Sequence, residues 1–190
     1  MTYSTPIFGT IPTLGIDLST SGYDQPYSAT ASNPNNPEYP QQPFQIGTVI
    51  TMSNGGEAIY AQTATATGIT QGNFCYINNL NLAAGLTSTI AATAGQGARL
   101  GISLATLTTG QYGWFQTNGG NTYGVTVVAS VAAYTTLHTS ATAGVLTGTA
   151  TTGTTYPISN IATVTTSGGT AGAYACVLNN PIINTATTLG

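Results

Sequence analysis

Short runs in which hydrophobic and polar residues alternate dominate the chain after residue 45. In the run ARLGISL, residues 98–104, every second residue is a large aliphatic one. The same repeat places Val125 and Val127 on one face of the run YGVTVVASV. A repeat of two residues is typical of a β-strand. On this pattern we predict strands over 46–52, 57–65, 73–78, 98–104, 113–118, 123–131, 134–139, 145–151, 161–166 and 172–183.

Gly and Asn mark the turns between these predicted strands. Asn54-Gly55 is a strong hairpin signal, and Asn118-Gly119-Gly120 is expected to turn the chain between two strands. No stretch shows a capped helical repeat, so we predict no helix beyond one turn within 103–110. Many short strands at regular spacing predict an all-β domain over residues 46–190, a β-sandwich or a jelly-roll or β-tulip-like barrel. A solenoid is disfavoured, because residues 139–172 show no fixed period.

Residues 1–45 differ from the rest in composition. They hold seven of the nine prolines together with many aromatic and aliphatic residues. Proline removes a backbone donor and fixes φ, so this segment cannot be a helix or a central strand. Its hydrophobic content is too high for a plain linker. We therefore predict an extended N-terminal arm that lies on a partner; the alternative is a long loop packed on its own domain.

Charge narrows the partners that this chain could bind. Charged residues make up 3% of the sequence, against roughly 25% in ordinary soluble domains. Arg99 is the only cation and there is no Lys. Binding to nucleic acid or to an anionic membrane needs several cations, so both are excluded. A chain with so few charges associates readily, and we expect it to function in an assembly, with Thr and Asn as its neutral surface.

The N-terminus and the cysteines bear on the compartment. The sequence begins with Met and shows no basic and apolar signal segment, which predicts a product made in the cytoplasm. Cys75 and Cys176 lie far apart in the sequence and form no CxxC motif. We interpret them as two small buried residues, and the sequence leaves open whether they pair.

Catalytic chemistry finds no support in the sequence. His138 is the only histidine and no acid lies near it, so we interpret it as a packed or surface residue. The carboxylates of Asp17, Asp24 and Glu38 all fall in the arm, and Glu57 adjoins a hairpin turn. No cluster suits zinc or calcium. We expect a non-enzyme with no catalytic residue, metal or cofactor.

The aromatic residues around the only Trp could suggest a sugar site. Tyr112, Trp114, Phe115 and Tyr123 lie close together in the sequence. In a strand, however, Trp114 and Phe115 point to opposite faces, so we interpret Trp114 as a core anchor. The residues that we predict to form the structural core are Trp114, Leu100, Ile102, Leu104, Val125 and Val127.

The segment from Arg99 to Gly119, RLGISLATLTTGQYGWFQTNG, resembles one that is common in small head proteins of tailed bacteriophages, the capsid decoration or cement proteins. The family pattern is an Arg-hydrophobic-Gly strand, a Gly-Gln-Tyr-Gly-Trp turn and a strand that ends at Gly. The matching residues are Arg99, Leu100, Gly101, Gly110, Gln111, Tyr112, Gly113, Trp114, Gln116 and Gly119. Looser likeness extends over about residues 46–183, and the arm has no counterpart.

The resemblance implies a structural virion protein on the outer surface of an assembled capsid. It would bind the major capsid protein and itself, as a homotrimer or as a dimer at a two-fold axis, and would hold neighbouring capsomers together against the pressure of packaged DNA. Arm residues would dock in grooves of the shell: Ile7, Phe8, Ile11, Leu14, Ile16, Tyr23, Tyr27, Tyr39 and Phe44.

Two alternatives to the capsid-cementing function differ in how well the sequence fits them. A receptor-binding or glycan-binding module, in a tail fibre or a lectin-like surface domain, would use an exposed Tyr112 or Tyr123. A major shell protein is disfavoured, because we find neither the helices nor the charged residues that such proteins need for their contacts.

Overall fold

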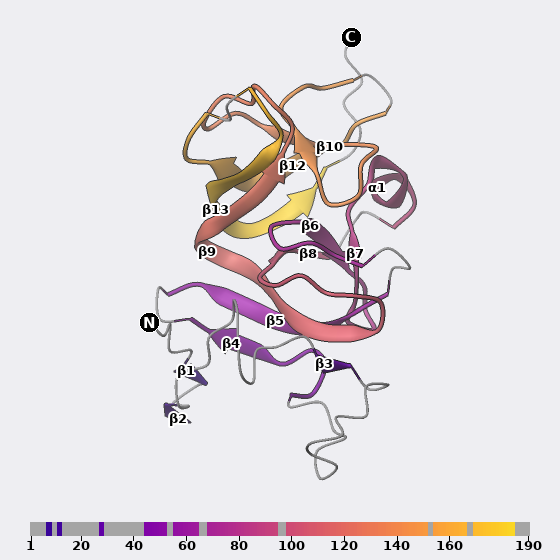
Figure 1. Cartoon of the computed structure of the whole chain (residues 1–190), viewed down its shortest axis with the longest axis vertical. Coiled ribbons are helices and arrows are strands. Elements are labelled where there is room, and N and C mark those ends of the chain that lie inside the picture. Colours follow the sequence, from indigo (N-terminus) through magenta and orange to yellow (C-terminus); the bar gives the residue numbers. More distant parts are fainter. Residues whose placement is uncertain are drawn as a thin grey trace.

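The computed structural model describes residues 44–52, 55–64, 68–94, 98–151, 154–166 and 169–184, and the backbone of residues 7–8, 11–12 and 27–28. Strands account for 51% of the described residues and helix for 5%, which confirms the predicted all-β fold of the sandwich-or-barrel class. Figure 1 shows an elongated molecule, with β4 and β5 toward one end and β10, β12 and β13 toward the other.

The described residues form thirteen strands and one helix. In chain order these are β1 (Ile7–Phe8), β2 (Ile11–Pro12), β3 (Tyr27–Ser28), β4 (Val49–Thr51), β5 (Glu57–Thr63), β6 (Phe74–Ile77), β7 (Leu82–Gly85), α1 (Ser88–Ala94), β8 (Arg99–Ser103), β9 (Gln111–Val127), β10 (Leu137–Thr139), β11 (Leu146–Thr147), β12 (Pro157–Thr163) and β13 (Gly172–Ile183).

Strand pairing closes two rings that share β9. The first barrel consists of β5, β7, β6, β8 and β9, and β9 returns to β5. The second ring consists of β9, β13, β12, β10 and β11, and closes where β11 runs parallel to β9 at Leu146 and Val127. Because β9 spans both, the two rings are stacked along the long axis of the molecule (Figure 1).

The strand β9 corrects the prediction of a turn at Asn118-Gly119-Gly120. The chain continues through these residues as one strand of 17 residues. Asn118 pairs with Glu57 of β5 and also with Asn179 of β13, so it stands where β9 passes from one ring to the other. Gly119 has a φ of +94°, a left-handed conformation that suits glycine. The Asn-Gly-Gly signal therefore marks a bend inside a strand.

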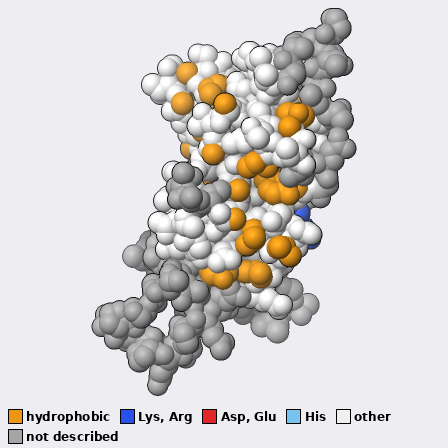
Figure 2. Space-filling model, turned by 90° about the vertical axis from the view of Figure 1, so that its right-hand side faces the viewer, with side chains coloured by type: hydrophobic (Ala, Val, Ile, Leu, Met, Phe, Trp, Pro, Cys, Tyr) orange, Lys and Arg blue, Asp and Glu red, His pale blue; other side chains and the backbone are white. Residues whose placement is uncertain are grey.

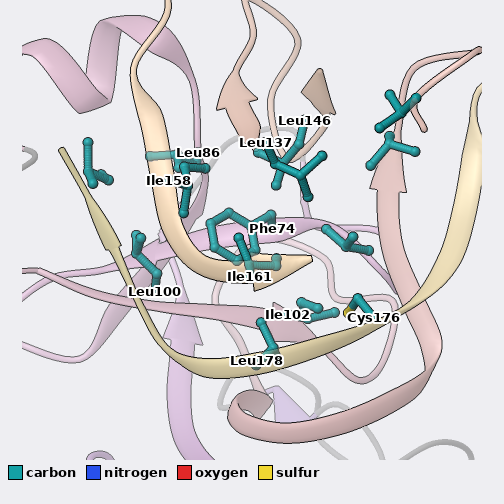
Figure 3. Close-up of a cluster of buried hydrophobic side chains, with 14 of the residues drawn as sticks. Phe74, Leu86, Leu100, Ile102, Leu137, Leu146, Ile158, Ile161, Cys176 and Leu178 are labelled. Atoms are coloured by element: carbon teal, nitrogen blue, oxygen red, sulfur yellow. The ribbon is translucent and has the colours of Figure 1, made fainter. Parts of the chain in front are cut away.

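The alternation of side chains produces three buried clusters. The barrel cluster lies inside the first barrel: Ile59, Ala61, Ile69, Cys75, Ile77, Ala83, Ala105, Leu107 and Phe115. The ring cluster fills the second ring and covers the outer face of β6 and β8; it includes Phe74, Leu86, Leu100, Ile102, Leu137, Leu146, Ile158, Ile161, Cys176 and Leu178 (Figure 3). The wall formed by β6 and β8 is therefore buried on both faces.

The third cluster, the aromatic cluster, contains Ile50, Ala58, Tyr60, Leu104 and Trp114, with Phe44, Met52 and Tyr112 packed against them. It lies on the side of β5 and β9 that faces away from the barrel cluster, since Trp114 and Phe115 fall in different clusters. All six residues that we predicted for the core are buried: Leu100, Ile102, Val125 and Val127 in the ring cluster, Leu104 and Trp114 in the aromatic cluster.

Two elements were not expected from the sequence. The helix α1 begins after Thr87, whose hydroxyl accepts a hydrogen bond from the backbone N–H of Ile90 at 3.1 Å, as an N-cap does. Its seven residues are too few to show a helical repeat, and Ala91 packs into the ring cluster. The strand β7 falls in a stretch for which we predicted no strand, and Asn78 to Asn81 precede it as a turn.

Candidate functional site

The aromatic cluster lies where the arm meets the β domain. The ring centroid of Phe44 is 5.1 Å from that of Trp114 and 5.4 Å from that of Tyr60, both in edge-to-face geometry. Tyr112 stacks on Tyr60 at 6.1 Å. Trp114 is only 1% exposed, so it cannot stack on a sugar. Phe44, which we predicted to contact a partner, is half-buried against its own chain.

Short strands of the arm pair with open edges of the β domain. The backbone of Ile7 pairs with Thr51 of β4, and Phe8 pairs with Ile11 within the arm. Tyr27 pairs with Tyr112 of β9. These described parts of the arm therefore lie on their own chain as added strands. Four other predicted contact residues, Leu14, Ile16, Tyr23 and Tyr39, lie outside the described residues.

The structure does not show an exposed aromatic side chain at either tyrosine that we predicted for the alternative glycan site. Tyr112 is half-buried in the aromatic cluster, and the side chain of Tyr123 lies outside the described residues. The most exposed large hydrophobic residue that the structure describes is instead Tyr134, at 73%. It has a φ of +57°, a rare conformation for an aromatic residue. Its backbone N–H donates to the carbonyl of Thr163 at 3.0 Å, which fixes the turn.

Two cavities meet at the mouth of the first barrel. One, of about 270 Å³, is lined by Val49, Glu57, Arg99, Thr117 and Ile182, with Ile59 of the barrel cluster beneath them. The other, of about 410 Å³, is lined by Gly47, Asn78, Asn81 and Arg99, with Ile77 of the barrel cluster beneath them. Arg99 lines both. We call this region the barrel mouth.

The barrel mouth gathers the charge of the described β domain. Arg99 is the only Lys or Arg of the whole chain, and Glu57 is the only acid among the described residues. The side chain of Arg99 is exposed, and no hydrogen bond or ion pair joins it to the described residues, Glu57 included. We did not predict this site from the sequence, although a single Arg in so neutral a chain was a signal that could have pointed to it.

The histidine and both cysteines are buried. His138 lies in β10 between Thr147 and Pro157 and is 8% exposed, which agrees with its interpretation as a packed residue. Both cysteines are free and buried. Burial raises the pKa of the Cys176 thiol to about 12 and raises that of Cys75 further, so neither thiol is a ready nucleophile.

Metal-binding clusters and membrane-spanning helices are both absent from the described residues. These residues contain no group of three or more His, Cys, Asp or Glu placed to hold a metal ion. Their helix is neither long nor apolar enough to cross a membrane.

Comparisons with known proteins add no family to this description. No protein-family model matches the chain, and a search of curated proteins found no match. The resemblance of residues 99–119 to phage head proteins therefore stays a prediction from the sequence motif.

Proposed function

We propose that this chain is a structural protein of a tailed-phage virion that binds the outer surface of the assembled capsid. The observation that carries the proposal is the pairing of short arm strands with open edges of the β domain: β1 with β4, and β3 with β9. Strand pairing of this kind can join separate chains as well as parts of one chain, because it needs only an edge and an extended segment.

The β domain suits such a role as a rigid body. Its two rings share β9, so the first barrel cannot move against the second ring without breaking the pairs of β9 with β5 or β13. The face in Figure 2 consists mainly of neutral side chains and backbone, with hydrophobic side chains among them. Such a surface can lie against a protein shell without desolvating many charges.

The arm would let one chain contact two capsomers that lie far apart. The 43 residues before Phe44 could span on the order of 100 Å as an extended chain. A chain that contacts two capsomers at once holds both in place, because neither can leave without breaking contacts on both sides. We propose the major capsid protein as partner, self-association as a trimer or as a dimer at a two-fold axis, and synthesis in the host cytoplasm.

Binding of the purified chain to empty shells of the source particle tests this proposal. The intact chain should co-sediment with the shells at saturating occupancy and raise the temperature at which they break. A variant without residues 1–40 retains Phe44 and hence the aromatic cluster, so it should fold and yet bind at least tenfold more weakly. Equal occupancy of both chains would refute the role of the arm. No binding by the intact chain would refute the proposed function.

Tyr134 favours a second candidate, a receptor-binding or glycan-binding module. Its exposed ring stands on a fixed turn, beside the exposed residues Thr135 and Thr166. An aromatic ring flanked by hydroxyl groups can stack on a neutral sugar. Under this function Tyr134→Ala would abolish binding to host-cell glycans and leave shell binding unchanged. The capsid function predicts that wild type and variant are equally inactive toward glycans.

A further inference from the structure

Arg99 is a cation without a partner among the described residues. The guanidinium group offers five donors in a fixed plane, which can bind a carboxylate through two parallel hydrogen bonds. Yet Glu57, which lines the same cavity, forms no ion pair with it. Because the side chain of Arg99 is exposed, water can satisfy these donors, and the group remains accessible to a carboxylate from outside the described residues.

The surroundings of Arg99 define what would fit there. Val49 and Ile182 line the same cavity and are 48% and 50% exposed, so one side of the barrel mouth is aliphatic. Asn78 and Asn81 line the adjoining cavity and provide neutral amides. A complementary segment would carry a carboxylate for Arg99 beside a large hydrophobic side chain for Val49 and Ile182.

The arm of this chain has that chemistry. Residues 1–45 contain three of the four acids and no cation, whereas Arg99 and Glu57 leave the remainder neutral. Each of these acids directly adjoins a large hydrophobic residue in the pairs Ile16-Asp17, Tyr23-Asp24 and Glu38-Tyr39. Charge thus separates into an acidic arm and a β domain whose one cation stands in an open cavity.

We propose that the barrel mouth binds the acidic arm of a second copy of this chain, with a carboxylate of Asp17, Asp24 or Glu38 on Arg99. Each copy then gives an arm and receives one, a head-to-tail contact that closes into a ring of copies. This surface rests on the self-association that is part of the proposed function, and it is tested without a shell, so its failure is distinguishable from a failure of shell binding.

Sedimentation velocity of the intact chain at low and high salt tests the proposal. The wild type should form a closed oligomer that dissociates as salt rises, because a partly exposed ion pair is screened. Arg99→Gln should weaken association by roughly tenfold or more, and Arg99→Lys should weaken it less. Thr149→Glu is the control, because it adds a charge at an exposed position that lines neither cavity. It should associate like the wild type.

A charge exchange identifies the occupant. Arg99→Glu and the triple variant Asp17→Lys/Asp24→Lys/Glu38→Lys should each fail to self-associate. Mixed together, they should form hetero-oligomers, because the exchanged charges are again complementary. Emission of Trp114 in each variant checks that the fold is intact.

Three outcomes would overturn the proposal. The first is a wild type that stays monomeric at every concentration. The second is an Arg99→Gln variant that associates like the wild type. The third is Arg99→Gln with unchanged mass but faster proteolysis of its arm, which would mean that the mouth holds the arm of the same chain.

Discussion

Gly124 of β9 lies directly against the backbone of Tyr174 on β13. A Cβ atom at Gly124 would stand 2.4 Å from the carbonyl carbon and oxygen of Tyr174, and the φ of Gly124 is +81°. Here the β9–β13 register shifts between Tyr174 and Cys176. The backbone N–H of Gly124 donates to the side-chain oxygen of Asn121 at 2.9 Å, which fixes the bulge. Only glycine fits at this point of the second ring.

We therefore expect Gly124→Ala to destabilise the protein by about 2–5 kcal/mol, from the left-handed backbone and the contact with Tyr174 together. Urea denaturation of the variant and the wild type measures this difference in the free energy of unfolding. Gly120→Ala in the same strand is the matched control, because a Cβ atom at Gly120 would have no atom within 4 Å and the φ of Gly120 is not positive. Equal losses in the two variants would contradict a specific role for Gly124.

The bend of β9 shows where sequence reasoning reaches its limit. Residues 118–120 carry the local signal of a turn, and locally that signal is correct, because Gly119 adopts a positive φ. Whether the chain reverses or continues there depends on β5 and β13, whose pairing residues lie about 60 positions away on either side. No local pattern contains that information. The split of Trp114 and Phe115, by contrast, was predictable, because alternation alone decides it.

The candidate site was less accessible to prediction than the core. Arg99 and Ile182 are distant in sequence and meet only because β8 and β13 both lie beside β9. The arm was predicted from its prolines, but its pairing with Thr51 and Tyr112 could not be, because pairing through the backbone leaves no side-chain pattern.

Gln116 provides a second test of the bend in β9. Its buried side-chain amide donates to the carbonyl oxygens of Asn118 at 2.9 Å and Gly120 at 3.1 Å. Gln116→Met keeps the length of the side chain and removes both donors, so we expect a loss of about 1–3 kcal/mol in unfolding free energy. Gln62→Met, which removes one bond to the carbonyl of Gly110, should cost less. If the Gln116 variant lost no more stability than the Gln62 variant, the two hydrogen bonds of Gln116 would not be stabilising the bend.

Stability should fall in alkaline solution because of the buried thiols. Burial raises the pKa of Cys176 from 9.0 to about 12 in the folded protein. The same holds for Cys75, whose pKa burial raises further. The unfolded chain therefore releases both protons first as pH rises. Stability is complete below pH 9 and declines by about 1.4 kcal/mol per pH unit for each thiol, about 2.8 kcal/mol in all, up to about pH 12. Urea titrations across this range measure the slope. Cys176→Ala should be less stable at neutral pH and show a shallower alkaline decline.

Native thiol labelling gives an independent check of the same burial. A thiol reagent should modify neither Cys75 nor Cys176 in the folded protein and both in urea, because both are free and buried. Rapid native labelling of either one would contradict the predicted alkaline behaviour.

The single Trp makes the junction of arm and β domain observable. Phe44 packs edge-on against Trp114 and is the first residue of the chain that the structure describes in full. Phe44→Ala should admit water to the indole and shift its native emission to longer wavelength. It should also lower the free energy of unfolding by about 1–3 kcal/mol, because Phe44 is half-buried.

Phe74→Leu is the control, because Phe74 belongs to the ring cluster and not to the aromatic cluster. This variant should lose stability while its native emission stays that of the wild type. An unchanged emission in Phe44→Ala would mean that Phe44 does not shield Trp114, and that the arm joins the β domain without support from the aromatic cluster.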